Sequence, residues 1–136
     1  MTEIRFTDRE LDLMDVLWAR GSATAAETQE ALRDELAYTT VLTILQTLED
    51  KGYVRSEKQG RAYRFYPEVD REEAGGSALR YVLDKVFRGS GAQMLHGMVD
   101  DVDLTREELR RMRRMLDERL AAGPEAVDRE PGEEDA

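Results

Sequence analysis

The hydrophobic period of the sequence changes at Gly52, and this change restricts the available folds more than any other feature. Before Gly52, apolar residues recur at the three- and four-residue spacing of amphipathic helices. After it come two β-prone runs, residues 53–56 and 62–66, joined by Glu57–Arg61 with Gly60 at the turn. The pattern predicts several helices followed by a β-hairpin.

Capping signals and apolar periodicity together predict three helices ahead of the hairpin. Thr7-x-x-Glu10 and Thr24-x-x-Glu27 are capping boxes, in which the two side chains satisfy free backbone amides at a helix start. The third helix is expected from about Thr39–Lys51. The residues expected on the apolar faces of the first and third helices are Leu11, Met14, Leu17, Trp18, Val41, Ile44, Leu45 and Leu48.

Three helices followed by a hairpin is the element order of a winged helix-turn-helix. The predicted fold class is therefore mainly α with a small β-hairpin: a winged helix-turn-helix domain over residues 1–69, then a helical dimerisation domain over 70–122. A three-helix bundle that carries a hairpin of no special role is the alternative. Residues 123–136 hold six acids against Arg129 and almost nothing apolar, so a disordered acidic tail is expected there.

The distribution of charge points to a nucleic-acid surface that the total charge hides. The chain has 20 Lys+Arg against 30 Asp+Glu, a net charge of -10, which by itself argues against nucleic acid. Residues 51–64, in contrast, hold five basic residues and only Glu57 as an acid. The alternative is a hairpin edge that charge protects from pairing. The basic residues expected to contact DNA phosphates are Lys51, Arg55, Lys58, Arg61 and Arg64.

The polar face of the third helix has an unusual composition. It is built of short neutral side chains instead of the Glu and Lys of an ordinary solvated face, although threonine is a mediocre helix former. A helix in the major groove needs side chains of this kind to reach base edges. The residues predicted to face bases are Thr39, Thr40, Thr43, Gln46 and Thr47.

The second helical region is expected to pair with a second copy of the chain. It is short for a unit with its own core, and its helices carry broad apolar faces. Methionines that line an effector pocket are the alternative reading. The residues predicted to form the dimer interface are Leu79, Val82, Leu83, Val86, Phe87, Leu95, Met98, Leu109, Met112 and Leu116.

Several motifs resemble those of the penicillinase-repressor and methicillin-resistance-repressor family. The resemblance covers roughly residues 5–121. The matching residues are Glu10, Met14, Leu17, Trp18, Tyr38-Thr39-Thr40-Val41, Leu45, Leu48, Glu49, Lys51-Gly52-Tyr53-Val54, Gly60-Arg61, Tyr66, Phe87, Gly89-Ser90, Leu104-Thr105 and Leu109.

This resemblance implies a homodimeric winged-helix repressor of a double-stranded DNA operator, with a regulatory link to antibiotic resistance. It also implies a membrane sensor-protease as a partner, which inactivates family members by cutting between Asn and Phe in the dimerisation domain. Gly97 and Met98 occupy the corresponding positions here and are the candidate proteolytic switch.

Other classes of function have little support in the sequence. The chain has no cysteine, no phosphate-binding loop and no paired catalytic carboxylates, so neither an enzyme nor a metal or other cofactor is expected. No apolar run suits a signal peptide or a membrane span, which predicts a cytoplasmic protein without membrane insertion. A winged-helix module that binds proteins, and a ligand-sensing regulator without proteolytic induction, remain alternatives.

Overall fold

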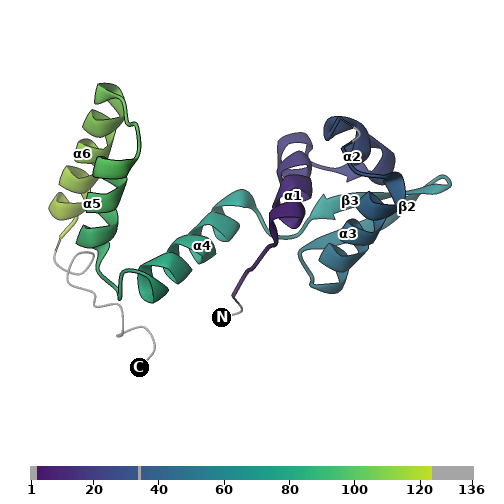
Figure 1. Cartoon of the computed structure of the whole chain (residues 1–136), viewed down its shortest axis with the longest axis horizontal. Helices are drawn as coiled ribbons and strands as arrows, with labels where there is room; N and C mark the ends of the chain where they lie inside the picture. Colours follow the sequence, from purple (N-terminus) through teal and green to yellow (C-terminus); the bar gives the residue numbers. More distant parts are fainter. Residues whose placement is uncertain (1–2, 34, 124–136) are drawn as a thin grey trace. The chain divides into compact units, whose positions relative to one another are not determined.

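The computed structural model describes residues 3–33 and 35–123. Apart from Gly123, the predicted acidic tail lies outside the described residues. The chain divides into two compact units, Met1–Arg80 and Tyr81–Ala136. The elements, drawn in Figure 1, are α1 (Asp8–Arg20), β1 (Ala23–Thr24), α2 (Ala25–Ala31), α3 (Tyr38–Asp50), β2 (Val54–Gln59), β3 (Ala62–Pro67), α4 (Arg71–Lys85), α5 (Gly91–Asp101) and α6 (Arg106–Ala121).

The first unit is a winged helix-turn-helix, which confirms the predicted fold class. The capping boxes of α1 and α2 form as predicted, and so does the one that the sequence places at the start of α6, with Thr105 and Glu108. Helix α3 ends as expected: Gly52 adopts a φ of 84°, and the Tyr53 amide donates to the Leu48 carbonyl at 3.0 Å. This is a Schellman ending, in which the left-handed conformation favours glycine.

The hairpin is longer than the sequence suggested. The expected loop Glu57–Arg61 was wrong, because residues 57–59 continue β2 and only Gly60 and Arg61 form the turn. Gly60 has a φ of 63°, and the tight turns of two-residue hairpin loops need a positive φ. The sequence also missed β1, which pairs with β3 to give a three-stranded antiparallel sheet of order β1-β3-β2.

The core lies where α1 and α3 meet the sheet. Its fully buried side chains include Met14 and Leu17, as expected, but also Leu13. Leu11 was expected on the apolar face of α1, and this expectation was wrong because its side chain is exposed. Helix α1 contacts α2, α3 and β3, so its buried face is wider than a single stripe and turned away from Leu11.

The first part of α4 belongs to the first compact unit. The indole Nε1 of Trp18 donates to the Val69 carbonyl at 2.8 Å, and the Arg71 guanidinium lies 5.0 Å from the indole ring centroid. Further along α4, the Ser77 hydroxyl exchanges hydrogen bonds with the backbone of Ile4. Because of these contacts, the first compact unit extends beyond residue 69 and ends at Arg80.

The second unit contains α5 and α6, and no residue of either helix is buried. None of the helices in the part of the chain that the structure describes has the length and apolar character needed to cross a membrane.

Gly75 and Gly76 lie inside α4, where a Cβ on either would have nothing within 4 Å. We expect Gly75→Ala and Gly76→Ala each to raise the free energy of unfolding by about 1 kcal/mol, because alanine costs less backbone entropy in a helix. Urea denaturation measures the change. Gly52→Ala is the control and should destabilise, since its φ of 84° strains any side chain. A loss of stability in Gly76→Ala would contradict the prediction.

Candidate nucleic-acid interface

The outer face of α3 presents the predicted polar residues to solvent. Thr39, Thr40, Thr43 and Gln46 are exposed, and Thr47 is partly buried. The opposite face, with Val41, Leu45 and Leu48, is fully buried. The core therefore fixes which side of the helix faces outward.

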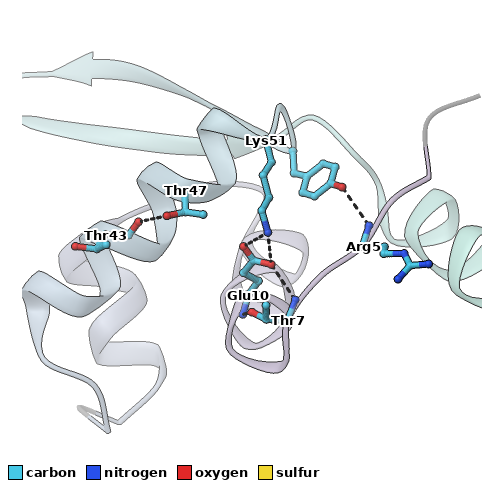
Figure 2. Close-up of polar contacts among 7 residues, drawn as sticks. Arg5, Thr7, Glu10, Thr43, Thr47 and Lys51 are labelled. Atoms are coloured by element: carbon cyan, nitrogen blue, oxygen red, sulfur yellow. Dashed lines mark hydrogen bonds and ion pairs between the residues drawn. The ribbon is translucent and has the colours of Figure 1, made fainter.

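Two of these threonines bond within their own helix. The Thr43 hydroxyl donates to the Thr39 carbonyl at 2.8 Å. The Thr47 hydroxyl donates to the Thr43 carbonyl at 3.0 Å (Figure 2). Each hydroxyl proton is thereby occupied. What remains for a partner is the methyl group and the acceptor lone pairs of the oxygen.

Lys51, at the end of α3, is held by the start of α1. Its Nζ lies 3.0 and 2.8 Å from the two carboxylate oxygens of Glu10, and the Thr7 amide donates to the same carboxylate at 2.8 Å (Figure 2). The Glu10 side chain is 5% exposed and that of Lys51 is 40% exposed. Lys51 therefore ties two helices together as well as carrying a charge at the surface.

A second polar contact joins α3 to the hairpin. One carboxylate oxygen of Glu49 accepts from the Ser56 amide at 3.0 Å and from the Ser56 hydroxyl at 2.6 Å. Ser56 lies on β2 and pairs with Phe65 of β3, which is buried in the core. The contact fixes the hairpin relative to α3.

Arg64 anchors the other strand of the hairpin. It donates to Glu27 at 3.0 Å, to Ser22 at 3.2 Å and to Gln59 at 2.8 Å, and its side chain is only 21% exposed. The hydrogen bond from Arg64, then that from the Thr24 amide, lowers the pKa of the Glu27 carboxyl and outweighs its desolvation. Glu27 thus serves both the α2 capping box and this ion pair.

Arg55 is also engaged within the hairpin. Its guanidinium lies 4.2 Å from the ring centroid of Tyr66 and pairs with Glu57 and with Glu68. The hydrogen bond with Glu57 is the main cause of a raised pKa for Arg55. Half of the side chain remains open to solvent.

Lys58 and Arg61 differ from the other basic residues of residues 51–64. Lys58 lies on β2 opposite Tyr63, and Arg61 lies in the turn. Both are exposed, and neither forms an ion pair with any described residue. The hairpin tip extends past α2 and α3 (Figure 1), which leaves these two charges open to a partner.

The sequence missed the acidic partners of this surface. Glu10 and Glu27 were recognised as capping residues, but their ion pairs with Lys51 and Arg64 join positions 41 and 37 residues apart. Glu49 matched a family motif without a predicted contact. No local spacing rule reports pairs so distant along the chain. Residues 3–33 and 35–123 hold no group of three His, Asp or Glu side chains placed to bind a metal ion.

Comparison with known proteins assigns the chain to a family. Residues 6–118 match the sequence profile of the penicillinase repressor. The match spans the winged helix and most of the helices that follow it.

The chain belongs to the penicillinase repressor family. The resemblance seen in the sequence motifs is thereby confirmed, and the family's class is that of transcriptional regulators.

Two named relatives show how the similarity is distributed. The methicillin resistance regulatory protein MecI of Mammaliicoccus sciuri is 20% identical over 112 residues, which cover 81% of this chain and 91% of MecI. The transcriptional regulator BlaI of Mycobacterium tuberculosis is 43% identical over 72 residues, about half of each chain.

Two solved structures are similar to parts of this chain. The protein hsRosR-S4 is 16% identical, covers 86% of this chain and 91% of its own, and superposes with a TM-score of 0.50. The DNA-binding domain of the repressor BlaI, solved in solution, is 27% identical over 53% of this chain and 90% of that domain, with a TM-score of 0.48.

In this member of the penicillinase repressor family, the predicted dimer residues are uncovered within the protomer. None of the ten is buried, and Leu79, Val86, Met98, Leu109 and Leu116 are exposed. Gly97 and Met98, the candidate proteolytic switch, lie inside α5.

The pKa of Glu10 provides a test of the α1–α3 ion pair. Burial opposes ionisation most strongly, but hydrogen bonds from Lys51 and the Thr7 amide, together with the Lys51 charge, hold this pKa below its ordinary value of 4.5. Because folding lowers the pKa, the pair contributes stability above pH 4.5 and loses it as the pH falls from there toward the folded-state pKa.

We expect Glu10→Gln to lower the free energy of unfolding at pH 7 by about 1–2 kcal/mol, because it removes a charge-assisted hydrogen bond but keeps a capping acceptor. Its stability should also depend less on pH in the acid range than that of the wild type. Urea midpoints across pH measure both effects. Glu3→Gln, at an exposed pair with Arg5, should change neither. Parallel pH profiles for Glu10→Gln and wild type would count against the ion pair.

Proposed function

We propose that the chain represses transcription as a homodimer that binds a pseudo-palindromic DNA operator. The observation that carries the proposal is the placement of two surfaces in one unit. The neutral polar face of α3 is open to solvent, and the hairpin beside it carries Lys58 and Arg61, which form no ion pair within residues 3–33 and 35–123.

In this proposal α3 enters the major groove and reads base edges. Its bonded threonines suit contact with thymine methyl groups and with the amino donors of adenine or cytosine. Gln46 carries an amide that can bind adenine through two hydrogen bonds. Thr39 and Thr40, at the start of the helix, lie where recognition helices meet bases.

The hairpin would contact the phosphate backbone beside the groove. Lys58 and Arg61 supply direct contacts, since neither forms an ion pair with a residue that the structure describes. Arg55 adds a charge that is shared with Glu57 and Glu68. Lys51 and Arg64 act mainly by holding α3 and β3 in position, and add to the local field.

Homodimerisation accounts for the apolar residues that the protomer leaves uncovered. Helices α5 and α6 bury no side chain within the protomer, and two of their large apolar side chains, Leu116 and Leu120, are 51% and 68% exposed. A second copy is the partner that the family and a two-fold operator both favour. Two recognition helices would then lie about 34 Å apart, one turn of DNA, or a multiple of it.

Arg61→Ala tests the role of the hairpin. We expect weaker operator binding and a salt dependence of log K reduced by about one, because one phosphate contact is lost. Fluorescence anisotropy on operator fragments selected from genomic DNA, at several salt concentrations, measures both. Arg80→Ala removes an exposed arginine of α4 and serves as the matched control. If no genomic fragment binds the wild type even at low salt, the module binds proteins instead.

Leu116→Glu tests the dimer. The substitution should shift the protein from dimer to monomer in sedimentation velocity, because it places a charge in the proposed apolar interface. The helix content should stay unchanged, since Leu116 is already half exposed in the protomer. Arg119→Gln on the same helix should remain dimeric. A dimer that tolerates Leu116→Glu would place the interface elsewhere.

We further propose control of β-lactam resistance genes through a membrane sensor-protease that cuts between Gly97 and Met98. The MecI relative is named for methicillin resistance regulation. A protease needs extended backbone, and α5, which buries no residue, can unwind at little cost. Cutting there would separate α6 from the DNA-binding unit.

Cells treated with a β-lactam should contain two fragments of the repressor, divided after Gly97, together with loss of bound sites in genome-wide mapping. Met98→Glu should leave the chain intact and the sites occupied, because a sensor that cuts before a large apolar residue would reject the charge. Mass spectrometry of the tagged repressor measures the cut. An intact chain with released DNA would favour a ligand-sensing regulator.

A further inference from the structure

Helix α6, the last helix that the structure describes, has an arginine-rich surface. The proposed recognition of DNA by α3 does not use this surface. Arg106, Arg110 and Arg114 follow a four-residue spacing and so lie above one another on one face, with Arg113 beside them. We call these four side chains the α6 arginine face. All four are exposed.

These charges have no partner among residues 3–33 and 35–123. The ion pairs that the structure contains there involve no side chain of α6. Glu108 is committed to the capping box with Thr105. Like charges four residues apart on a helix repel one another, so the α6 arginine face gains from an anionic partner.

The sequence supplies such a partner immediately after the helix. Helix α6 ends at Ala121, and the segment that starts at Pro124 holds six acids against Arg129. The six acidic residues are Glu125, Asp128, Glu130, Glu133, Glu134 and Asp135. This strongly acidic segment lies next in sequence to α6, in which six arginines outnumber four acids.

We propose that the acidic segment 124–136 docks on the α6 arginine face of its own chain. A helix rises about 1.5 Å per residue, so Arg114 lies about 14 Å and Arg106 about 25 Å from Gly123 along the helix axis. The segment can extend over about 43 Å, enough to run back along the whole helix. The short tether gives a high effective concentration, so individually weak ion pairs add up.

Docking would keep the α6 arginine face from binding DNA phosphates. Four arginines on one face form a phosphate-binding stripe when uncovered, and such binding is independent of sequence. The segment therefore limits non-specific binding and leaves α3 to select the operator. The inference concerns only the segment and α6, so it can fail or hold independently of operator recognition.

The first test uses the absence of cysteine in the chain. A spin label on Gly132→Cys in the full chain should broaden the amide signals of α6 in NMR spectra. The broadening should fade at high salt, because ionic contacts are screened. Signals of residues 54–67 should be unaffected. Broadening confined to the residues next to Gly123, unchanged by salt, would overturn the proposal.

The second test measures the consequence on random-sequence duplex DNA. Full-length protein with the six acids changed to Asn or Gln should bind such DNA at least about tenfold more tightly at low salt, since each freed arginine adds to phosphate binding. In an Arg110→Gln, Arg113→Gln, Arg114→Gln background the gain should fall below about twofold.

A matched background separates the two basic surfaces. In Lys58→Gln, Arg61→Gln protein, neutralising the acids should still give the full gain. A gain that survives in the α6 background and disappears in the Lys58, Arg61 background would overturn the proposal and place the acidic segment on the hairpin. Glutamine is a good helix former, and circular dichroism confirms that α6 is retained.

Discussion

Burial of one face of α3 is the constraint on which the rest of the winged-helix unit depends. Val41, Leu45 and Leu48 are fully enclosed by α1, α2 and the sheet, so the helix has one possible orientation. The threonine-rich face is then outward because no other side is free. A large gain from apolar burial thus fixes where weak, specific polar contacts can be made.

Polar contacts refine what the core sets. Three acidic side chains connect α3 and the hairpin to their neighbours: Glu10 holds Lys51, Glu49 holds Ser56, and Glu27 holds Arg64. Each links two elements, and the Glu49–Ser56 contact joins the hairpin directly to α3. A surface that must match the spacing of a groove and its phosphates benefits from this rigidity.

The overall acidity of the protein is compatible with DNA binding because charge is separated along the chain. Acids near α1 and α2 act as caps and ion-pair partners, while Lys58 and Arg61 remain available at the hairpin. Charge is also separated in the C-terminal half, where the basic helix α6 is followed by an acidic segment. In both places a net charge summed over the chain conceals local surfaces of opposite sign.

The sequence by itself determined the starts of α1 and α2, the two faces of α3 and the turn glycine at Gly60, because caps, periodicity and positive φ are local properties. The tertiary structure alone decided that Lys51 and Arg64 form ion pairs, whereas Lys58 and Arg61 form none among the described residues. It also decided the pairing of β1 with β3 and the outward position of Leu11. These outcomes depend on residues tens of positions apart, whose proximity only the packed core creates.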